Sequence, residues 1–95
     1  MIKRIVKLPL MPGKVLDFIQ KFKDAKPSIL ASKGCRHLEL LRDTEDDNLF
    51  FTFSIWDSEA DLTSYRDSAI FMKIWEEVKP MFNGEPQAWT LQNPG

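Results

Sequence analysis

The segment Leu49-Phe50-Phe51-Thr52-Phe53-Ser54-Ile55-Trp56 constrains the fold more than any other part of the chain. Its aromatic and β-branched residues predict a strand. One face of that strand is wholly apolar and the other is mixed but aromatic at both ends: Leu49, Phe51, Phe53 and Ile55 against Phe50, Thr52, Ser54 and Trp56. A half-exposed antiparallel strand usually has a plainly polar second face. Both faces of this strand are therefore expected to be covered.

The rest of the chain offers cover for only one of these faces. Helical spacing of apolar residues predicts one helix through Val15, Phe18, Ile19 and Phe22. A broader stripe predicts another helix through Ile70, Phe71, Ile74, Trp75 and Val78. Both helices are expected on the same face of the sheet, and no other segment remains for the second face. A second copy of the chain is the expected partner, so the protein is predicted to be a homodimer.

Three further strands are predicted, over residues 2–8, 35–42 and 87–91. The polar connector 43–48 is short, which indicates an antiparallel hairpin between its two flanking strands. The predicted order is β-α-β-β-α-β. It indicates one α+β domain over residues 1–95, with a ferredoxin-like antiparallel sheet and helices on one face. Strict alternation places Cys35, His37, Glu39 and Leu41 together on one face of the strand over 35–42.

Local signals set the expected ends of the helices. Pro27 predicts a break or kink near Lys26, because proline disrupts a helix interior. Gly34 suits the left-handed residue that follows a helix. Ser58 resembles the start of a capping box, and Ser68 is expected to cap a second helical piece.

Composition narrows the classes of function. Thirteen basic and fourteen acidic residues give a formal charge of −1 without a basic stripe, so no nucleic-acid partner is expected. Cys35 is the single cysteine, which argues against a disulfide framework or a thiolate metal cluster. Charges interrupt the N-terminal apolar residues, so we expect neither a signal peptide nor a membrane span, and a cytoplasmic protein.

The aromatic content is high for a small core: seven Phe, three Trp and one Tyr in 95 residues. Either the core is unusually aromatic, or some of these side chains line a pocket or a subunit interface. The acidic connector 43–48 superficially resembles a calcium loop, but Asn48 stands where the loop needs Gly and Ser54 where it needs Glu. A solvated hairpin connector is expected instead.

Three short motifs lie in order along residues 34–71: Gly34-Cys35 at a strand start, Trp56-Asp57-Ser58-Glu59 after an apolar strand, and Ser68-Ala69-Ile70-Phe71 in a helix. In this order they resemble the antibiotic biosynthesis monooxygenase-like domains of the dimeric α+β barrel superfamily. The resemblance implies a homodimeric barrel with a pocket between sheet and helices. Some members oxidise phenols or quinols with molecular oxygen and no metal or flavin, others degrade heme, and many have no established activity.

The chain departs from this family where chemistry would be expected. Heme-degrading members carry an Asn on the first strand, and a Trp and a His where this chain has Tyr65 and Trp75. The first strand here has no Asn and the axial His is missing, so heme degradation is not expected. Phenol-oxidising members have an Asn at the position of Thr52, and many members have a His at the position of Tyr65. Trp56 alone carries over, and no cofactor is expected.

Trp56 is the first candidate for a catalytic residue, because an indole N–H at a strand end can bind a phenolate. Tyr65 and His37 are the candidate acid/base groups, and Glu39 lies on the same strand face as His37. The plainer alternatives are that Trp56 plugs the helix–sheet junction, that Tyr65 packs in the core, and that His37 and Glu39 form an exposed or interface pair.

Thr52, Phe71 and Trp75 are the expected lining of an apolar pocket for a flat ligand, with core packing as the alternative for Trp75. Three hypotheses of function follow. The first is a cofactor-free monooxygenase that acts on a small phenolic or quinol-like aromatic compound. The second is a non-catalytic dimeric module that binds a hydrophobic metabolite. The third is a dimerisation or interaction domain with a filled pocket.

Overall fold

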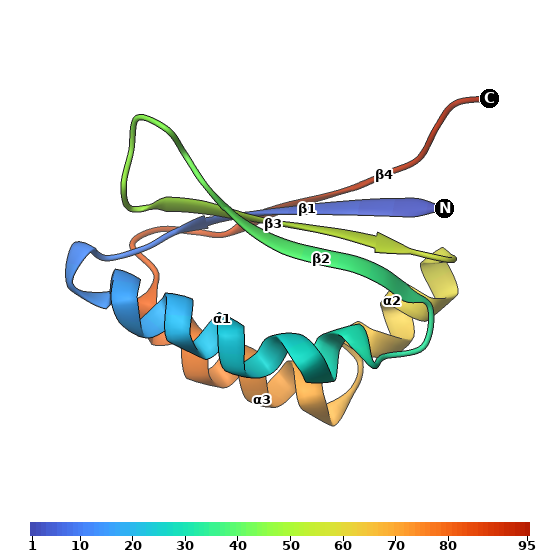
Figure 1. The fold of residues 1–95 in the computed structure, drawn as a ribbon, viewed down its shortest axis with the longest axis horizontal. Coiled ribbons are helices and arrows are strands. Elements are labelled where there is room, and N and C mark those ends of the chain that lie inside the picture. Colours follow the sequence, from blue (N-terminus) through green and yellow to red (C-terminus); the bar gives the residue numbers. More distant parts are fainter.

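An antiparallel sheet forms one layer of the protein and the helices form the other, as Figure 1 shows. The computed structural model describes residues 1–95. The strands are β1 (Ile2–Pro9), β2 (Cys35–Arg42), β3 (Leu49–Trp56) and β4 (Gln87–Leu91), in the lateral order β2-β3-β1-β4. The helices are α1 (Val15–Leu30), α2 (Glu59–Arg66) and α3 (Ala69–Val78), with 3₁₀ turns at Pro12–Lys14 and Lys79–Met81. The predicted ferredoxin-like α+β fold and its element order are confirmed.

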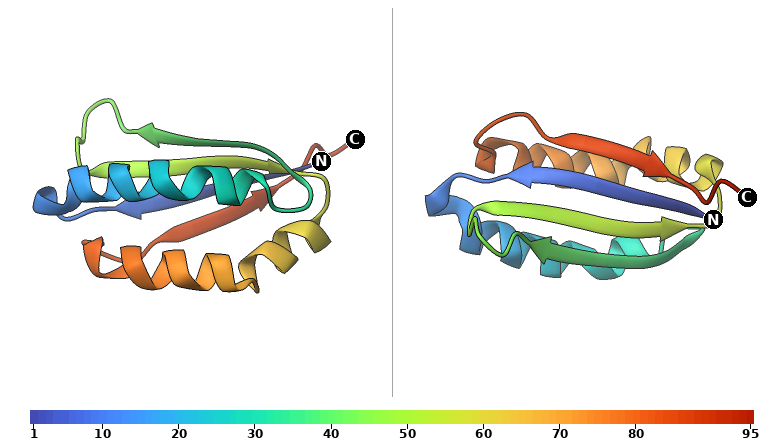
Figure 2. Two further views of the ribbon diagram at one scale, coloured as in Figure 1. Left: turned by 60° about the horizontal axis from the view of Figure 1, so that its bottom comes forward. Right: turned by 90° about the horizontal axis from the view of Figure 1, so that it is seen from above.

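The helices cover one face of the sheet only. The view in the right half of Figure 2 looks onto the other face, over which no helix passes. On the covered side β3 presents its mixed face, with Phe50, Ser54 and Trp56 buried. Its wholly apolar face turns the other way, and all four of its side chains remain partly exposed: Leu49, Phe51, Phe53 and Ile55.

Two apolar clusters hold the layers together. The larger joins the sheet to α1 and α3 and consists of Leu8, Leu10, Phe18, Phe50 and Val78. The smaller joins the ends of β1 and β3 to α2 through Ile2, Trp56 and Leu62, with Cys35 and Tyr65 packed against it. Partly buried side chains surround both clusters, and a cavity lies beside them.

The predicted break at Lys26 is wrong, because α1 continues through Pro27 to Leu30. Pro27 lies in the last turn with its ring exposed, and it costs the helix one hydrogen bond, the one that residue 27 would donate to the Lys23 carbonyl. The last turn brings Ile29 into the core, and the Ala31 N–H donates to the Pro27 carbonyl at 3.0 Å. These contacts stabilise the turn despite the proline.

Gly34 ends the connection after α1 as predicted, in the left-handed region with φ of 82°. A second constraint adds to the backbone conformation. A Cβ at this position would lie 2.3 Å from Oδ2 of Asp61, at the start of α2. Only glycine therefore fits between the α1–β2 turn and α2.

The face assignment over 35–42 is wrong at Cys35, because β2 contains a β-bulge. Cys35 pairs with Trp56, but His37 pairs with Ile55, so Arg36 is the extra residue. The bulge moves Cys35 to the helix-facing side of the sheet, away from His37 and Glu39. The guanidinium of Arg36 binds the Asp57 carboxylate through two hydrogen bonds of 2.8 Å, which fixes the bulge against the end of β3.

Hydroxyl caps divide the second helical region as predicted. The Ser58 Oγ accepts from the Asp61 N–H at the start of α2, and the Ser68 Oγ accepts from the Phe71 N–H at the start of α3, both at 3.2 Å. No helix is long and apolar enough to cross a membrane.

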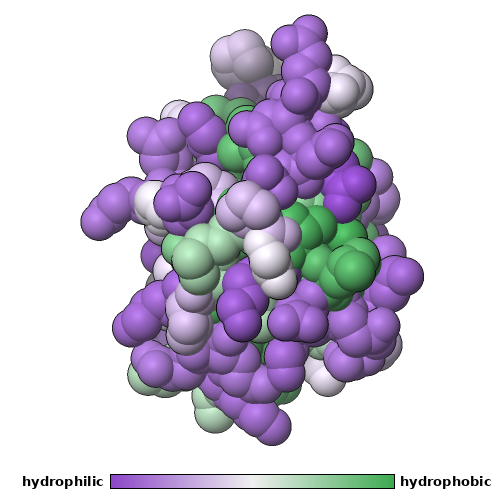
Figure 3. Space-filling model, turned by 90° about the vertical axis from the view of Figure 1, so that its left-hand side faces the viewer, coloured by the Kyte–Doolittle hydropathy of each residue, from purple (hydrophilic) through white to green (hydrophobic).

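The acidic connector of the β2–β3 hairpin is held by hydrogen bonds from its backbone N–H groups to its own side chains. Asp43 accepts hydrogen bonds from the N–H groups of Glu45 and Asp46, and Asp46 accepts one from Asn48. Figure 3 views the molecule from the end that carries this connector, and hydrophilic side chains dominate that surface around a smaller hydrophobic area. The connector is thus a solvated turn.

Candidate functional site

A cavity of about 470 Å³ lies between the sheet and the helices. This volume falls within the range of roughly 300–1,000 Å³ that is common for small-molecule sites. Strands β1, β2 and β3 form its floor, α1, α2 and α3 form its walls, and residues 85–88 before and within β4 close one side. Most of its lining is apolar, including Val6, Phe22, Leu38 and Ile74.

Five aromatic side chains run along the cavity in continuous contact, and we call them the aromatic row: Trp56, Tyr65, Phe71, Trp75 and Phe82. Successive ring centroids lie 5.1, 5.3, 6.0 and 5.5 Å apart. The Trp56–Tyr65 and Phe71–Trp75 pairs are stacked, and the Tyr65–Phe71 pair meets edge to face. The row borders the cavity with aromatic groups, and because the stacked faces already contact each other, a planar ring would meet its remaining faces and edges.

Trp56 is almost completely enclosed, with 1% of its surface exposed. Its indole Nε1–H donates to the Ser54 Oγ at 3.0 Å, so this N–H is already satisfied inside the protein. The Ser54 hydroxyl lines the cavity and donates to no protein acceptor. Ser54 is therefore one hydrogen-bond donor that this end of the cavity offers to a ligand, with Trp56 holding its oxygen in place.

Sequence reasoning missed Ser54 as a functional residue. A usable signal was present, since Ser54 precedes Trp56 by two residues and so shares its strand face. A serine in that position of a buried face needs a partner, and the indole N–H is the nearest donor.

Tyr65 packs between Trp56 and Phe71, and burial raises the pKa of its phenol to about 12, with a smaller contribution from Cys35. At neutral pH the phenol is therefore protonated. It can donate a hydrogen bond or a proton to a ligand, but it cannot serve as a base.

The titration of Tyr65 is expected to have its midpoint near pH 12 in the folded protein, against 10.0 for a free phenol. Burial favours the neutral form, so its contribution to stability is complete below about pH 10 and is lost as the pH rises from 10 to 12. Because Tyr65 is the single tyrosine, the near-ultraviolet phenolate absorbance reports this residue alone. In concentrated urea the midpoint should return to about 10; a midpoint of 10 in the folded protein would contradict the burial.

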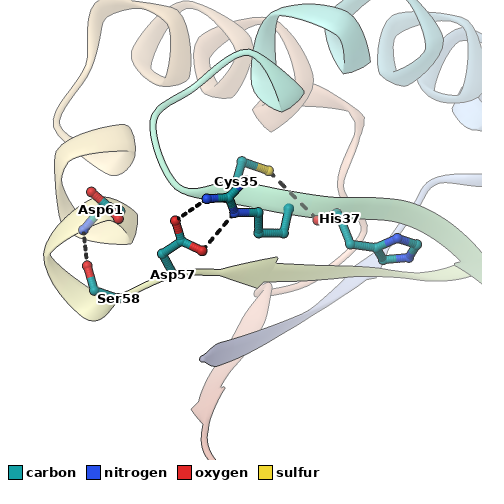
Figure 4. Close-up of polar contacts among 6 residues, drawn as sticks. Cys35, His37, Asp57, Ser58 and Asp61 are labelled. Atoms are coloured by element: carbon teal, nitrogen blue, oxygen red, sulfur yellow. Dashed lines mark hydrogen bonds and ion pairs between the residues drawn. The ribbon is translucent and has the colours of Figure 1, made fainter.

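His37 lies on the uncovered side of the sheet and is not brought together with Trp56 and Tyr65. Its ring is 5.8 Å from that of Phe53, and its Nε2 is 3.4 Å from Oε1 of Glu39. Figure 4 shows Cys35 pointing toward the helices while His37 lies on the other side of β2. The sheet itself thus separates the His37–Glu39 pair from the cavity of the same chain.

Thr52, Phe71 and Trp75 all line the cavity, beside Trp56 and Tyr65. Cys35 packs behind Trp56 and Tyr65 rather than in the lining, and burial raises the pKa of its thiol. No three His, Cys, Asp or Glu side chains lie close enough to share a metal ion.

Charged residues also line the cavity, and sequence reasoning missed them. Arg4, Lys21 and Arg66 are the basic ones, and Glu85 is the acidic one. Lys21 is paired with Glu77 across α1 and α3. Arg4 shares a strand face with Ile2, Val6 and Leu8. This alternation could have predicted that Arg4 lies on the helix-facing side of the sheet.

The antibiotic biosynthesis monooxygenase family matches residues 1–77 of the chain. No curated protein matches the chain by sequence. A conserved protein of Methanosarcina mazei Go1 has a similar crystal structure, with a TM-score of 0.91, 20% identity, and coverage of 96% of this chain and 90% of that one. A Bordetella bronchiseptica protein named after the antibiotic biosynthesis monooxygenases is 25% identical, with a TM-score of 0.88 and coverage of 97% and 95%. A Nitrosomonas europaea protein of the same name is 13% identical over the full length of both chains, with a TM-score of 0.90.

Proposed function

The chain belongs to the antibiotic biosynthesis monooxygenase family, and from this premise we propose that it is a cofactor-independent monooxygenase acting on a small phenolic or quinol-like aromatic compound. The observation that carries the proposal is the cavity with its aromatic row. Its volume accommodates a compound of two fused rings, and the row borders one side of it with aromatic groups. The cavity thus favours a planar ring system over an extended chain.

The proposed reaction needs no electron source other than the substrate. The phenolate reduces O₂ at a ring carbon that carries hydrogen, and a carbon–oxygen bond forms there. The O–O bond then breaks: one oxygen stays on the ring as a carbonyl, and the other leaves as water with the ring hydrogen and one proton, which replaces the phenolic proton released to solvent when the phenolate formed. A phenol and O₂ thus give a quinone and water.

Two side chains are suited to assist this reaction. The Ser54 hydroxyl, held by the Trp56 indole, can donate to the phenolate oxygen. Tyr65 is protonated at neutral pH and can donate to the departing oxygen. The substrate binds as the phenolate already present in solution, and the apolar lining excludes water from it. Thr52, Phe71 and Trp75 position the ring, and His37 of the same chain takes no part.

Oxygen consumption with 1-naphthol tests the proposal. We expect uptake of O₂ with formation of 1,4-naphthoquinone, and no return of O₂ on addition of catalase, because water rather than peroxide is the second product. Ser54→Ala should lower the rate by about 10²-fold, as the loss of one oxyanion donor does. Ser64→Ala, an exposed serine of α2, is the matched control and should retain the wild-type rate.

The alternative is a non-catalytic module that binds a small hydrophobic compound in the same cavity. It is favoured by the engaged indole N–H and the neutral phenol, which leave the aromatic row without a base. Binding of 1-naphthol without oxygen uptake above the buffer rate would establish this alternative and overturn the enzymatic proposal for simple phenols.

We also propose that two copies pair through the uncovered face of the sheet. That face brings together apolar side chains of three adjacent strands, since Ile5 on β1 pairs with Phe53 on β3 and with Trp89 on β4. Trp89 and Leu91 are 44% and 46% exposed in the single chain. Lys3, Lys7 and the His37–Glu39 pair lie on the same face around these apolar side chains. A partly apolar sheet face of this kind is typical of an interaction surface, and a second identical face is its simplest complement.

A further inference from the structure

Arg4 occupies a position that an apolar residue would be expected to fill. It lies on β1 between Ile2 and Val6 on the helix-facing side of the sheet, opposite Ser54 on β3 and Thr90 on β4. Its guanidinium lines the cavity and makes one side-chain hydrogen bond, from Nη1 to the Thr90 Oγ1 at 2.7 Å. A half-buried arginine usually has an anionic partner, because withdrawing the charge from water is costly.

Arg66 brings a second positive charge to the same end of the cavity. It is the last residue of α2, follows Tyr65 directly and lines the cavity from its exposed rim. Burial and the charge of Arg66 both lower the pKa of Arg4, as expected for two neighbouring cations. We call Arg4 and Arg66 the arginine pair.

No anionic group of the chain neutralises the arginine pair. The ion pairs of the structure join other residues, and none places a carboxylate oxygen within 4.0 Å of either guanidinium. Glu85 is the single acidic residue of the lining, and it is exposed and forms no ion pair. Two like charges beside an apolar cavity repel each other, and a bound anion would relieve that repulsion.

We propose that the arginine pair binds a carboxylate carried by an aromatic ligand whose ring lies against the aromatic row. The ligand class is therefore an aromatic acid rather than a neutral phenol. Guanidinium groups match the planar carboxylate and can donate two parallel hydrogen bonds to it. Arg4 is half-buried and Arg66 is exposed, so the carboxylate sits at the cavity rim while the ring points inward.

This inference rests on the cavity used in the proposed function and specifies its substrate class. Ser54 lies opposite Arg4 in the β1–β3 register, so a hydroxyl next to the carboxylate on the ring would come near the Ser54 donor. An ortho-hydroxy aromatic acid would then use both donors, with the reacting phenolate held by Ser54 and the carboxylate by the arginine pair.

Calorimetric titration with 2-naphthoate and with 2-naphthylmethanol tests the proposal, because the two probes share a ring system and differ in charge. The wild-type protein should bind the acid roughly tenfold or more tightly than the alcohol. Arg66→Gln, an exposed substitution, should reduce this preference to about twofold and leave the alcohol's Kd within about twofold. Arg4→Met should do the same and retains the bulk of the side chain. Arg42→Gln, an exposed arginine outside the cavity lining, is the matched control and should keep the full preference.

Each outcome separates this inference from the proposed function. Equal affinity for the acid and the alcohol, or an unchanged preference in both Arg66→Gln and Arg4→Met, would overturn the arginine pair as a carboxylate site. If neither probe binds, the carboxylate site is overturned as well. Selective binding of 2-naphthoate with no oxygen uptake from 1-hydroxy-2-naphthoate would support the carboxylate site and contradict the monooxygenase proposal alone.

Discussion

Phe53→Asp is expected to yield a monomer of 11.0 kDa where the unmodified chain sediments as a species of twice that mass at micromolar concentration. Phe53 lies in the middle of the uncovered face, in register with Ile5 on β1 and Glu39 on β2. In a symmetric dimer the variant would bury two carboxylates, one from each copy. Glu39 lies opposite position 53, and Lys3 and Lys7 lie on the same face on either side of Ile5. Burying a carboxylate costs several kcal/mol, which the nearby lysines offset only in part, so association should weaken by at least about 10²-fold.

The control for this experiment is Met72→Asp. Met72 is 60% exposed on α3, at the opposite layer of the molecule, so its substitution should leave the dimer intact. Phe53→Asp should remain folded by circular dichroism, because the two core clusters lie on the other side of the sheet. An unmodified chain that sediments only at 11.0 kDa, or a Phe53→Asp variant that still forms the dimer, would refute the proposed interface.

The sequence predicted that both faces of β3 need cover, but it could not predict which face meets the helices. The wholly apolar face would be the natural choice for the core, yet the structure buries the face that carries Thr52 and Ser54. The reason lies in the cavity. Thr52 and Ser54 border open space instead of packed side chains, and Ser54 is satisfied by the Trp56 indole. A buried polar group is tolerated where such a partner exists.

Strand alternation was reliable until the bulge at Arg36. Nothing in Cys35-Arg36-His37 indicates an extra residue, because the bulge accompanies contacts with another strand: Cys35 packs against Trp56, and Arg36 pairs with Asp57. The side of the sheet occupied by a residue near a bulge is thus a tertiary property. The same limitation applied to Pro27, where packing of Ile29 outweighs a local preference.

The candidate site was only partly predictable for a related reason. Aromatic residues at helical spacing indicated a pocket wall, since Tyr65, Phe71 and Trp75 follow one another along α2 and α3. The polar groups of the cavity come from β1 and β3 and meet Arg66 only through the register of the sheet. Arg4 follows Lys3 in a charged segment, so the sequence alone indicates a surface residue. The register of the sheet shows that it lies on the helix-facing side.

Trp56→Ala is expected to reduce the free energy of unfolding by about 3–5 kcal/mol, a large part of the stability of a domain this size. The side chain is 1% exposed, packs with Ile2 and Leu62 and stacks on Tyr65, so its removal leaves a large void next to the cavity. It also leaves the Ser54 hydroxyl without its indole donor. Urea unfolding of the variant measures the loss. Met72→Ala on the exposed side of α3 is the control and should change stability by less than about 0.5 kcal/mol.

Trp56→Phe separates packing from hydrogen bonding at the same position. It retains most of the apolar contact and removes the N–H, so we expect a smaller loss of about 1–2 kcal/mol. In a Ser54→Ala background the additional loss from Trp56→Phe should shrink, because the partner of the N–H is already absent. Additive losses in the double variant would contradict the Trp56–Ser54 bond.

A loss below about 1 kcal/mol for Trp56→Ala would contradict its place in the core. Because Trp56 is both a core residue and the support of Ser54, lost activity in a Trp56 variant indicates a role in catalysis only where the variant's measured stability shows that it remains folded.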